Sequence, residues 1–284
     1  MDRDDSRELV LFIHGMWLDT SCWREWAQEF DRAGYQSLSF RWPGEQATAA
    51  AWRGNGRALP LGIRDLRREI AGLAGFARRL ADRRPVVVGH GAGGLLAEIL
   101  LAHGAARGAV SIAPLPAGLS AAASAVRLAR GPRATAWIAV GRGSVTPAPA
   151  QFRRAFAAAV PRGEAAWLYE SHATPGQPQP LLRSLLTIDR DGGWRGSDDA
   201  RRSVGGLHRQ VAASRGPLLL ISAAQDRIVP EASVSALHRR YRRRHPGTVT
   251  DYQVFLDRGH SLTIDSGWRS VAYYCLDWLT RQGL

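Results

Sequence analysis

Residues 86–96 read Val-Val-Val-Gly-His-Gly-Ala-Gly-Gly-Leu-Leu, a β-branched run that breaks into glycines and then resumes as an apolar helical pattern. This order predicts a buried strand, a sharp turn and a helix. Gly89, Gly91 and Gly94 satisfy the dinucleotide-binding pattern G-x-G-x-x-G. Gly89 and Gly93 also satisfy the outer positions of G-x-S-x-G, in which a strained turn presents a nucleophilic serine. Gly91 stands where that serine would be.

Length and composition predict a globular protein with a large core. The chain has 284 residues, 45% of them hydrophobic, which suits either one large α/β domain with an insertion or two smaller domains. Residues 1–8 are charged, and no later stretch offers about 18 uninterrupted apolar residues, so we expect a soluble cytoplasmic protein without a membrane span. Cys22 and Cys275 lie far apart without metal-type spacing, so we expect two free thiols and neither a metal site nor a cofactor.

The charge of the chain comes from arginine alone. The formal net charge is +13, and all 38 basic residues are arginine. Such a bias, together with abundant alanine and glycine, is typical of a GC-rich coding background and builds no particular binding face. The densest run, residues 239–244, follows a helical pattern and is most simply its solvated end. We therefore expect neither nucleic acid nor a membrane as a partner.

Apolar strands alternate with amphipathic helices along most of the chain, which predicts a mostly parallel sheet of about six strands with helices on both faces. The predicted strands are residues 7–13, 36–40, 85–88, 109–113, 217–222 and 249–256. The predicted helices are residues 21–30, 61–81, 95–102, 231–241 and 267–279.

The alternation stops in the middle of the chain. Residues 115–203 contain no convincing buried strand, but short helical patterns broken by prolines at positions 132, 147, 149, 161, 175, 178 and 180. We interpret this stretch as a helical cap inserted into an α/β core formed by residues 1–114 and 204–284.

The surroundings of the glycine turn distinguish its two interpretations. A dinucleotide site needs an acidic residue at the end of the next strand, but that strand ends Ser-Ile-Ala-Pro at residues 111–114. A nucleophile turn needs an amide donor after an early strand, an acid after a late strand and a histidine after the last one. His14-Gly15-Met16, Asp226 and His260 occupy those places in that order.

Three motifs carry a resemblance to a known family. Residues 14–17 (His-Gly-Met-Trp), 225–230 (Gln-Asp-Arg-Ile-Val-Pro) and 257–262 (Asp-Arg-Gly-His-Ser-Leu) resemble the oxyanion, acid and histidine loops of α/β-hydrolase-fold proteins with a helical cap. The resemblance extends over nearly the whole chain. It implies that Met16 and Ala92 provide the oxyanion-hole amides and that Asp226 orients His260. It also implies ester or amide hydrolysis as the family chemistry.

Substrate contacts are less defined. The resemblance implies a small, largely apolar substrate held near the cap, although ordinary packing is an equally good explanation for each aromatic residue. The candidate substrate-binding residues are His14, Trp17, Phe152, Phe156, Trp167 and Trp194.

Gly91 departs from the family at the residue that forms the covalent bond. Ala92 has no nucleophile, and we expect the His90 side chain to point away from the site, so neither replaces the serine. Three hypotheses follow. The protein is an enzyme in which His260 acts as a general base without an acyl-enzyme, an inactive binding or regulatory protein, or an engineered serine-to-glycine variant of an ordinary esterase. The sequence predicts no oligomeric state.

Overall fold

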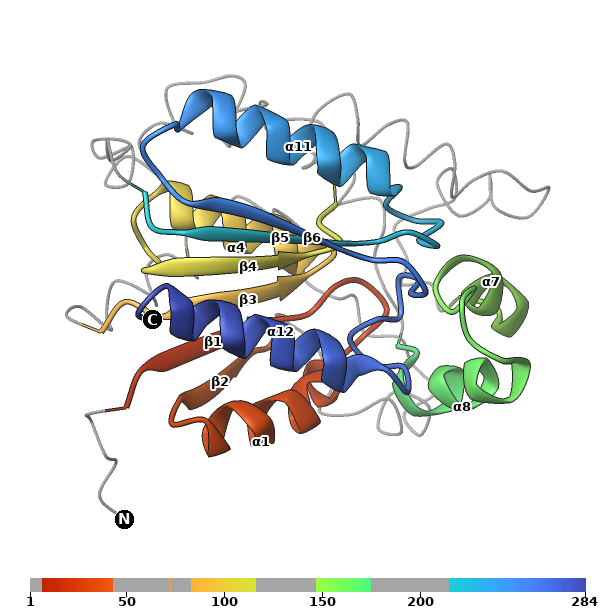
Figure 1. Cartoon of the computed structure of the whole chain (residues 1–284). Coiled ribbons are helices and arrows are strands. Elements are labelled where there is room, and N and C mark those ends of the chain that lie inside the picture. Colours follow the sequence, from red (N-terminus) through yellow and green to blue (C-terminus); the bar gives the residue numbers. More distant parts are fainter. Residues whose placement is uncertain (1–6, 43–71, 73–82, 116–146, 175–214) are drawn as a thin grey trace, which may run out of the picture.

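Six parallel strands form the centre of the fold (Figure 1). The computed structural model describes residues 7–42, 72, 83–115, 147–174 and 215–284. Within them the strands are β1 (Leu9–Ile13), β2 (Gln36–Phe40), β3 (Val86–His90), β4 (Gly108–Ile112), β5 (Leu218–Ala223) and β6 (Thr250–Phe255). Their order in the sheet is β2-β1-β3-β4-β5-β6, and every neighbouring pair is parallel. The predicted parallel α/β sheet is confirmed.

The strands follow the apolar runs of the sequence because parallel strands are covered on both faces. Every residue of β1, β3, β4 and β5 is buried, whereas β2 and β6 at the two edges are partly exposed. Ile13 pairs with Gly89 and His90 pairs with Ile112, so the loops after β1, β3 and β4 emerge side by side.

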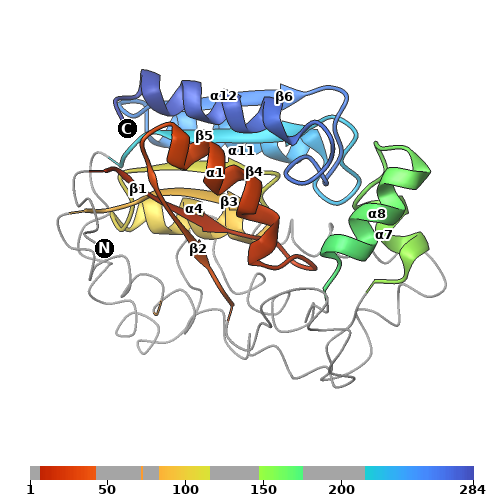
Figure 2. The same cartoon turned by 90° about the horizontal axis from the view of Figure 1, so that it is seen from below.

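Helices cover both faces of this sheet (Figures 1 and 2). One face carries α1 (Arg24–Arg32), which follows a short 3-10 helix (Thr20–Trp23), and α12 (Trp268–Arg281). The other carries α4 (Ala92–Ala102) and α11 (Glu231–Arg244), which are joined by a 2.9 Å hydrogen bond from the Tyr241 hydroxyl to Glu98.

Aromatic residues fill the core between β1 and α1. Trp23 and Trp26 are fully buried, and the Phe12 ring stacks on Trp23 with centroids 5.1 Å apart. The Trp26 indole also donates to the Thr263 carbonyl at 2.9 Å, which ties α1 to the segment before α12. These two tryptophans, three positions apart, are therefore core residues.

The described part of the predicted cap consists of two helices, α7 (Pro149–Ala155) and α8 (Arg162–His172). Both lie beyond the carboxyl ends of the strands in Figures 1 and 2. The rest of residues 115–203, including Trp194, and most of the predicted helix at 61–81 fall outside the described residues. The cap boundaries therefore remain a prediction.

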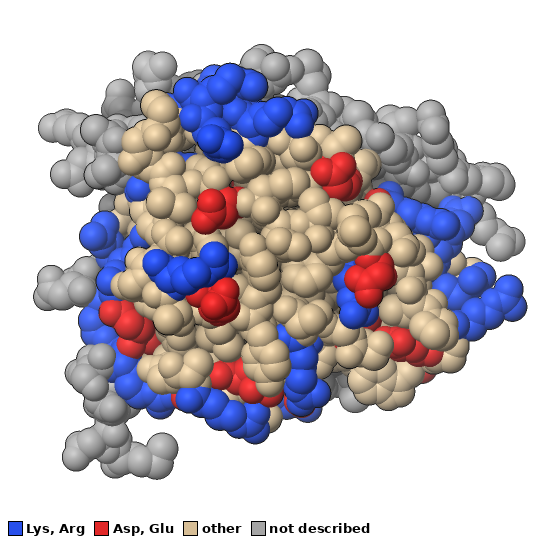
Figure 3. All heavy atoms as spheres, in the orientation of Figure 1, with Lys and Arg blue, Asp and Glu red and all other residues tan. Residues whose placement is uncertain are grey.

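Charged side chains of both signs are spread over the face seen in Figure 3. The arginines of the 239–244 run are on α11, and those at positions 239, 242, 243 and 244 are exposed, as expected for a solvated helix end. No helix among the described residues is both long and apolar enough to cross a membrane.

Candidate active site

The glycine turn between β3 and α4 has the backbone of a nucleophile turn. Gly91 has φ 58° and ψ −114°, a combination that side-chain-bearing residues rarely adopt. A Cβ on Gly89 would lie 2.0 Å from the Gly93 carbonyl oxygen, and a Cβ on Gly93 would lie 2.0 Å from that of Ile13. Glycine is required at both flanking positions because strand and helix approach so closely there.

The position of the missing side chain faces His260. A Cβ built on Gly91 would lie 3.6 Å from His260 Nε2 and 3.6 Å from the Gly15 Cα, both ordinary contacts. A hydroxyl one bond further out would come within hydrogen-bonding reach of Nε2. The turn therefore has room for a serine side chain at position 91.

Asp226 and His260 form a buried pair. Asp226 follows β5 and His260 follows β6, and His260 Nδ1 lies 2.7 Å from Asp226 Oδ2. The other carboxylate oxygen, Oδ1, accepts the backbone N–H groups of Ile228 at 2.7 Å and Val229 at 2.8 Å. Because the Asp226 side chain is fully buried and accepts three donors, it fixes the imidazole with Nδ1 as the donor and Nε2 toward Gly91.

Backbone hydrogen bonds join the two loops that carry this pair. Gln225 N–H donates to the Arg258 carbonyl at 2.9 Å, and Ala224 N–H donates to the Phe255 carbonyl at 3.0 Å. The distance between Asp226 and His260 is thus set by main-chain contacts as well as by their own bond.

The predicted oxyanion loop lies against the glycine turn, since β1 is the neighbour of β3. Ala92 is the first residue of α4, where backbone N–H groups have no acceptor within the helix. Among the described residues, neither the Met16 nor the Ala92 amide donates to a backbone carbonyl. Both amides are therefore suited to stabilise a developing oxyanion, the role that the sequence motifs predict.

His90 lies directly behind His260, contrary to the expectation that it points away from the site. Its ring is fully buried, with its centroid 4.5 Å from that of His260. Its Nε2 lies 3.0 Å from the His260 carbonyl oxygen. Sequence reasoning missed this contact because the two residues are 170 positions apart.

The predicted substrate-binding aromatic residues fall into two groups. Phe156 packs edge-on against His260 with centroids 5.0 Å apart, and Phe152 stacks on Phe156 at 4.8 Å, so both lie beside the candidate site. Trp167, in contrast, is 60% exposed, because α8 turns Ala165 and Leu168 inward instead. Its exposure gives no support to a role in the apolar wall, which stays a prediction.

The two remaining candidates lie in the oxyanion loop and are buried. His14 Nδ1 donates to the Gly15 carbonyl at 2.9 Å, and the His14 carbonyl accepts the Trp42 indole N–H at 3.3 Å. Trp17 has φ 64°, a left-handed conformation that costs a non-glycine residue of the order of 1–3 kcal/mol. These contacts hold the loop in place, and they do not assign either side chain to a substrate.

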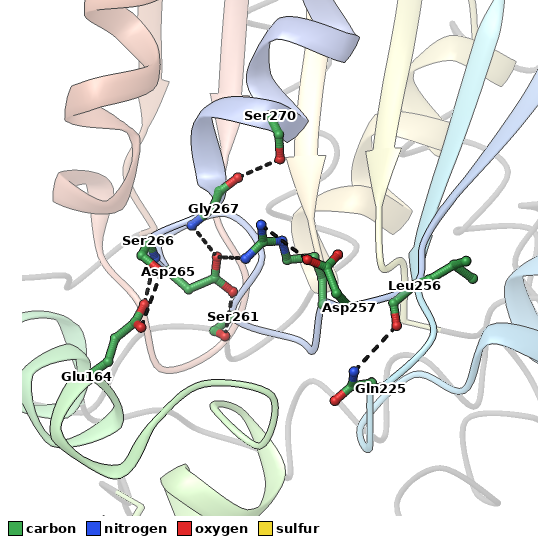
Figure 4. A network of polar contacts seen from close by, with 10 residues as sticks. Glu164, Gln225, Leu256, Asp257, Ser261, Asp265, Ser266, Gly267 and Ser270 are labelled. Carbon is green, nitrogen blue, oxygen red and sulfur yellow. Dashed lines mark hydrogen bonds and ion pairs between the residues drawn. The ribbon is translucent and has the colours of Figure 1, made fainter.

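Figure 4 shows how α8 contacts the histidine loop. Glu164 accepts hydrogen bonds from the Ser266 N–H at 2.6 Å and from its hydroxyl at 3.2 Å. Asp265 accepts the Ser261 hydroxyl at 3.0 Å and the Gly267 N–H at 3.1 Å, and Arg258 pairs with it at 3.6 Å. Burial raises the pKa of Asp265.

The other end of α8 contacts the oxyanion loop. Thr174 donates its N–H to the Trp17 carbonyl and its hydroxyl to the Leu18 carbonyl, both at 3.0 Å. The segment from Glu164 to Thr174 therefore spans the two loops that flank Gly91. Sequence reasoning gave no signal for these contacts, since single polar residues at helix ends have no periodicity.

Neither a metal nor a dinucleotide interpretation gains support from the described residues. They contain no group of three His, Cys, Asp or Glu side chains placed to hold a metal ion. Strand β4 ends at Ile112 and is followed by Ala113 and Pro114. Its end therefore lacks the acidic residue that would bind a ribose hydroxyl.

Comparisons with known proteins agree with this fold. The family model described as "Alpha/beta hydrolase family" matches residues 10–272. The search of curated proteins gave no significant match.

The fold is also similar to solved structures at low sequence identity. A structure from the metagenome-derived lipolytic enzymes LipS and LipT is 19% identical, with a TM-score of 0.60 over 97% of this chain and 94% of that one. Polyneuridine aldehyde esterase is 14% identical, with a TM-score of 0.60 over 97% and 100% of the two chains. A variant of tomato methylketone synthase I, complexed with β-ketoheptanoate, is 11% identical, with a TM-score of 0.64 over 99% and 100%.

Proposed function

The chain belongs to the α/β-hydrolase family, and on that premise we propose that it acts on a small, apolar carbonyl compound through His260 and Asp226, without an acyl-enzyme intermediate. Ester hydrolysis is the chemistry of its esterase and lipase relatives in fold. Here the covalent step has no nucleophile, since Gly91 carries no hydroxyl. The remaining chemistry is proton transfer.

The observation that carries this proposal is the 2.7 Å bond between His260 Nδ1 and Asp226 Oδ2. An aspartate on one imidazole nitrogen holds the tautomer and stabilises the imidazolium, which serves base catalysis and is needless for passive binding. His260 Nε2 would take a proton from a water or from the substrate in the space over Gly91. The Met16 and Ala92 amides would stabilise the negative charge that develops on the carbonyl oxygen.

Two substrate classes fit this arrangement. In an ester, His260 would take a proton from a water that attacks the carbonyl carbon, and the imidazolium would pass that proton to the alkoxide, which leaves as the alcohol. In a β-keto acid, the bond between the α-carbon and the carboxylate would break to release carbon dioxide, and the α-carbon of the enolate left behind would take a proton from the His260 imidazolium to give a methyl ketone. The reaction of the β-keto acid needs no nucleophile that attacks the carbonyl carbon. Tomato methylketone synthase I structures with β-ketoheptanoate and with 2-tridecanone make these acids a rational choice for testing.

The test uses p-nitrophenyl butyrate and β-ketoheptanoate as substrates of the purified protein. His260→Ala should lower the rate about 10²–10⁴-fold, the usual contribution of a positioned general acid or base. Asp226→Asn should lower it because the imidazole loses its orienting acceptor. The matched control is His245→Ala, at the carboxyl end of α11, which should leave the rate unchanged.

A folded His260→Ala variant with unchanged turnover of both substrates would contradict the proposal. It would leave the binding-protein hypothesis as the better account.

A further inference from the structure

We infer that His90 is a positioning residue for His260, holding the histidine loop at the distance from Gly91 that proton transfer requires. This inference rests on the proposed role of His260 as the base. His90 is a neighbour of Gly91 in sequence and contacts the residues on both sides of the site. Nothing in the sequence motifs assigns it a role.

The contacts of His90 reach the main chain and the ring of His260. A backbone carbonyl only accepts hydrogen bonds, so His90 Nε2–H donates to the His260 carbonyl, 3.0 Å away. The imidazole rings lie with centroids 4.5 Å apart, and Phe156 packs 6.0 Å from His90 and 5.0 Å from His260. The rings of His90 and Phe156 thus limit rotation of the His260 ring, and the hydrogen bond from His90 holds the His260 backbone.

His90 also contacts the opposite loop. A Cβ on Gly15 would lie 3.1 Å from His90 Nδ1 and 3.1 Å from its carbonyl oxygen. Glycine at position 15 therefore lets the His90 ring pack directly against the oxyanion loop. One side chain connects the loop that carries Met16 with the loop that carries His260.

The hydrogen bonding of His90 selects one neutral tautomer. Nε2 carries the proton, and Nδ1 is buried without a hydrogen-bond partner among the described residues. A second proton at Nδ1 would have no acceptor, and burial holds the pKa of His90 well below its usual range. His90 is therefore an uncharged neighbour, which does not oppose protonation of His260 during the reaction.

Three substitutions separate positioning from packing. His90→Phe keeps a planar ring but removes the donor, whereas His90→Gln keeps an uncharged N–H of similar reach. His90→Asn is smaller, and its amide is too short to reach the His260 carbonyl. The asparagine variant replaces phenylalanine in the comparison if the larger ring prevents folding.

The kinetic readout is a split between kcat and KM on the substrate that wild type turns over. His90→Phe should lower kcat about 10–100-fold while KM changes less than about threefold, the range typical of losing a partner that orients a reacting group. His90→Gln should recover most of the lost kcat. A loss of packing alone would not be rescued by glutamine.

The second readout does not depend on turnover. The proton on His260 Nδ1, bonded to Asp226, should give a downfield NMR signal in wild type and in His90→Gln, and this signal should broaden or vanish in His90→Phe. If wild type shows no activity but the signal follows this pattern, the proposed function fails and the positioning role stands. A folded His90→Phe or His90→Asn variant with the wild-type signal would overturn the positioning role.

Discussion

At the scale of single residues, Gly91 has two opposite effects. Its φ of 58° is costly for a residue with a Cβ, so glycine relieves strain that a serine would impose. The same absence of a side chain removes the group that would form an acyl-enzyme. On the proposed function, the other catalytic groups surround this position, and His260 Nε2 lies only 3.6 Å from a Cβ built on Gly91.

This relief of strain is measurable. Gly91→Ala and Gly91→Ser should each lower the free energy of unfolding by about 1–3 kcal/mol, because the backbone angle and not steric overlap is the obstacle. Urea denaturation measures the change. Gly247→Ala, in an open turn with nothing within 4 Å of the added Cβ, is the control and should be nearly neutral. Equal stability of wild type and Gly91→Ala would show that the turn relaxes without strain.

At the scale of elements, the sequence predicts what local patterns determine. All six strands lie where the sequence predicts them. The four inner strands are rich in apolar residues, because strands buried on both faces tolerate few polar ones, whereas the edge strands β2 and β6 alternate or mix polar and apolar residues. The sequence locates the loops that carry Asp226 and His260, because each loop follows a predicted strand and matches a family motif. The two loops lie close together because a parallel sheet gathers the carboxyl ends of its strands at one edge.

Contacts between distant segments could not be predicted from patterns. The bonds of Glu164 to Ser266 and of Thr174 to Leu18 join segments 102 and 156 residues apart, and each depends on one polar side chain. The exposure of Trp167 shows a related limit. A short amphipathic helix does not reveal from sequence which face it turns to the core, and α8 buries Leu168 instead.

At the scale of the whole molecule, the buried acid Glu98 links α4, α11 and β4. These contacts lie on the face of the sheet opposite α1 and α12. Glu98 on α4 accepts the Tyr241 hydroxyl of α11 at 2.9 Å and lies 2.7 Å from the Ser111 hydroxyl of β4. That hydroxyl also lies 3.0 Å from the Gly94 carbonyl oxygen. Because it has a single proton, both contacts are hydrogen bonds only when Glu98 is protonated and donates to the Ser111 oxygen. Burial, the largest effect, raises the pKa of Glu98 to about 7.

This buried acid predicts how stability depends on pH. The folded-state pKa of about 7 lies above the usual 4.5, so the contribution of Glu98 is complete below 4.5 and is lost as the pH rises through 7. The loss is of the order of 3 kcal/mol. Glu98→Gln, which stays neutral, should remove this dependence.

Urea unfolding of both proteins at pH 5 and pH 8 checks this prediction. The difference between their free energies of unfolding isolates Glu98, because the other titrating groups are common to both proteins and cancel. Relative to Glu98→Gln, wild type should be less stable at pH 8 than at pH 5. A difference between the two proteins that does not change with pH would mean that Glu98 is ionised throughout.

We propose that the site lacks only a serine hydroxyl for acyl transfer, so that catalysis proceeds without a covalent intermediate. Intact-mass measurement after treatment with a fluorophosphonate probe tests it directly. Wild type should gain no adduct, whereas Gly91→Ser should be labelled stoichiometrically at the introduced serine, and much more slowly when combined with His260→Ala. An adduct on wild type would reveal another nucleophile, and a folded Gly91→Ser protein that stays unlabelled would show that His260 and the glycine turn are not arranged as described.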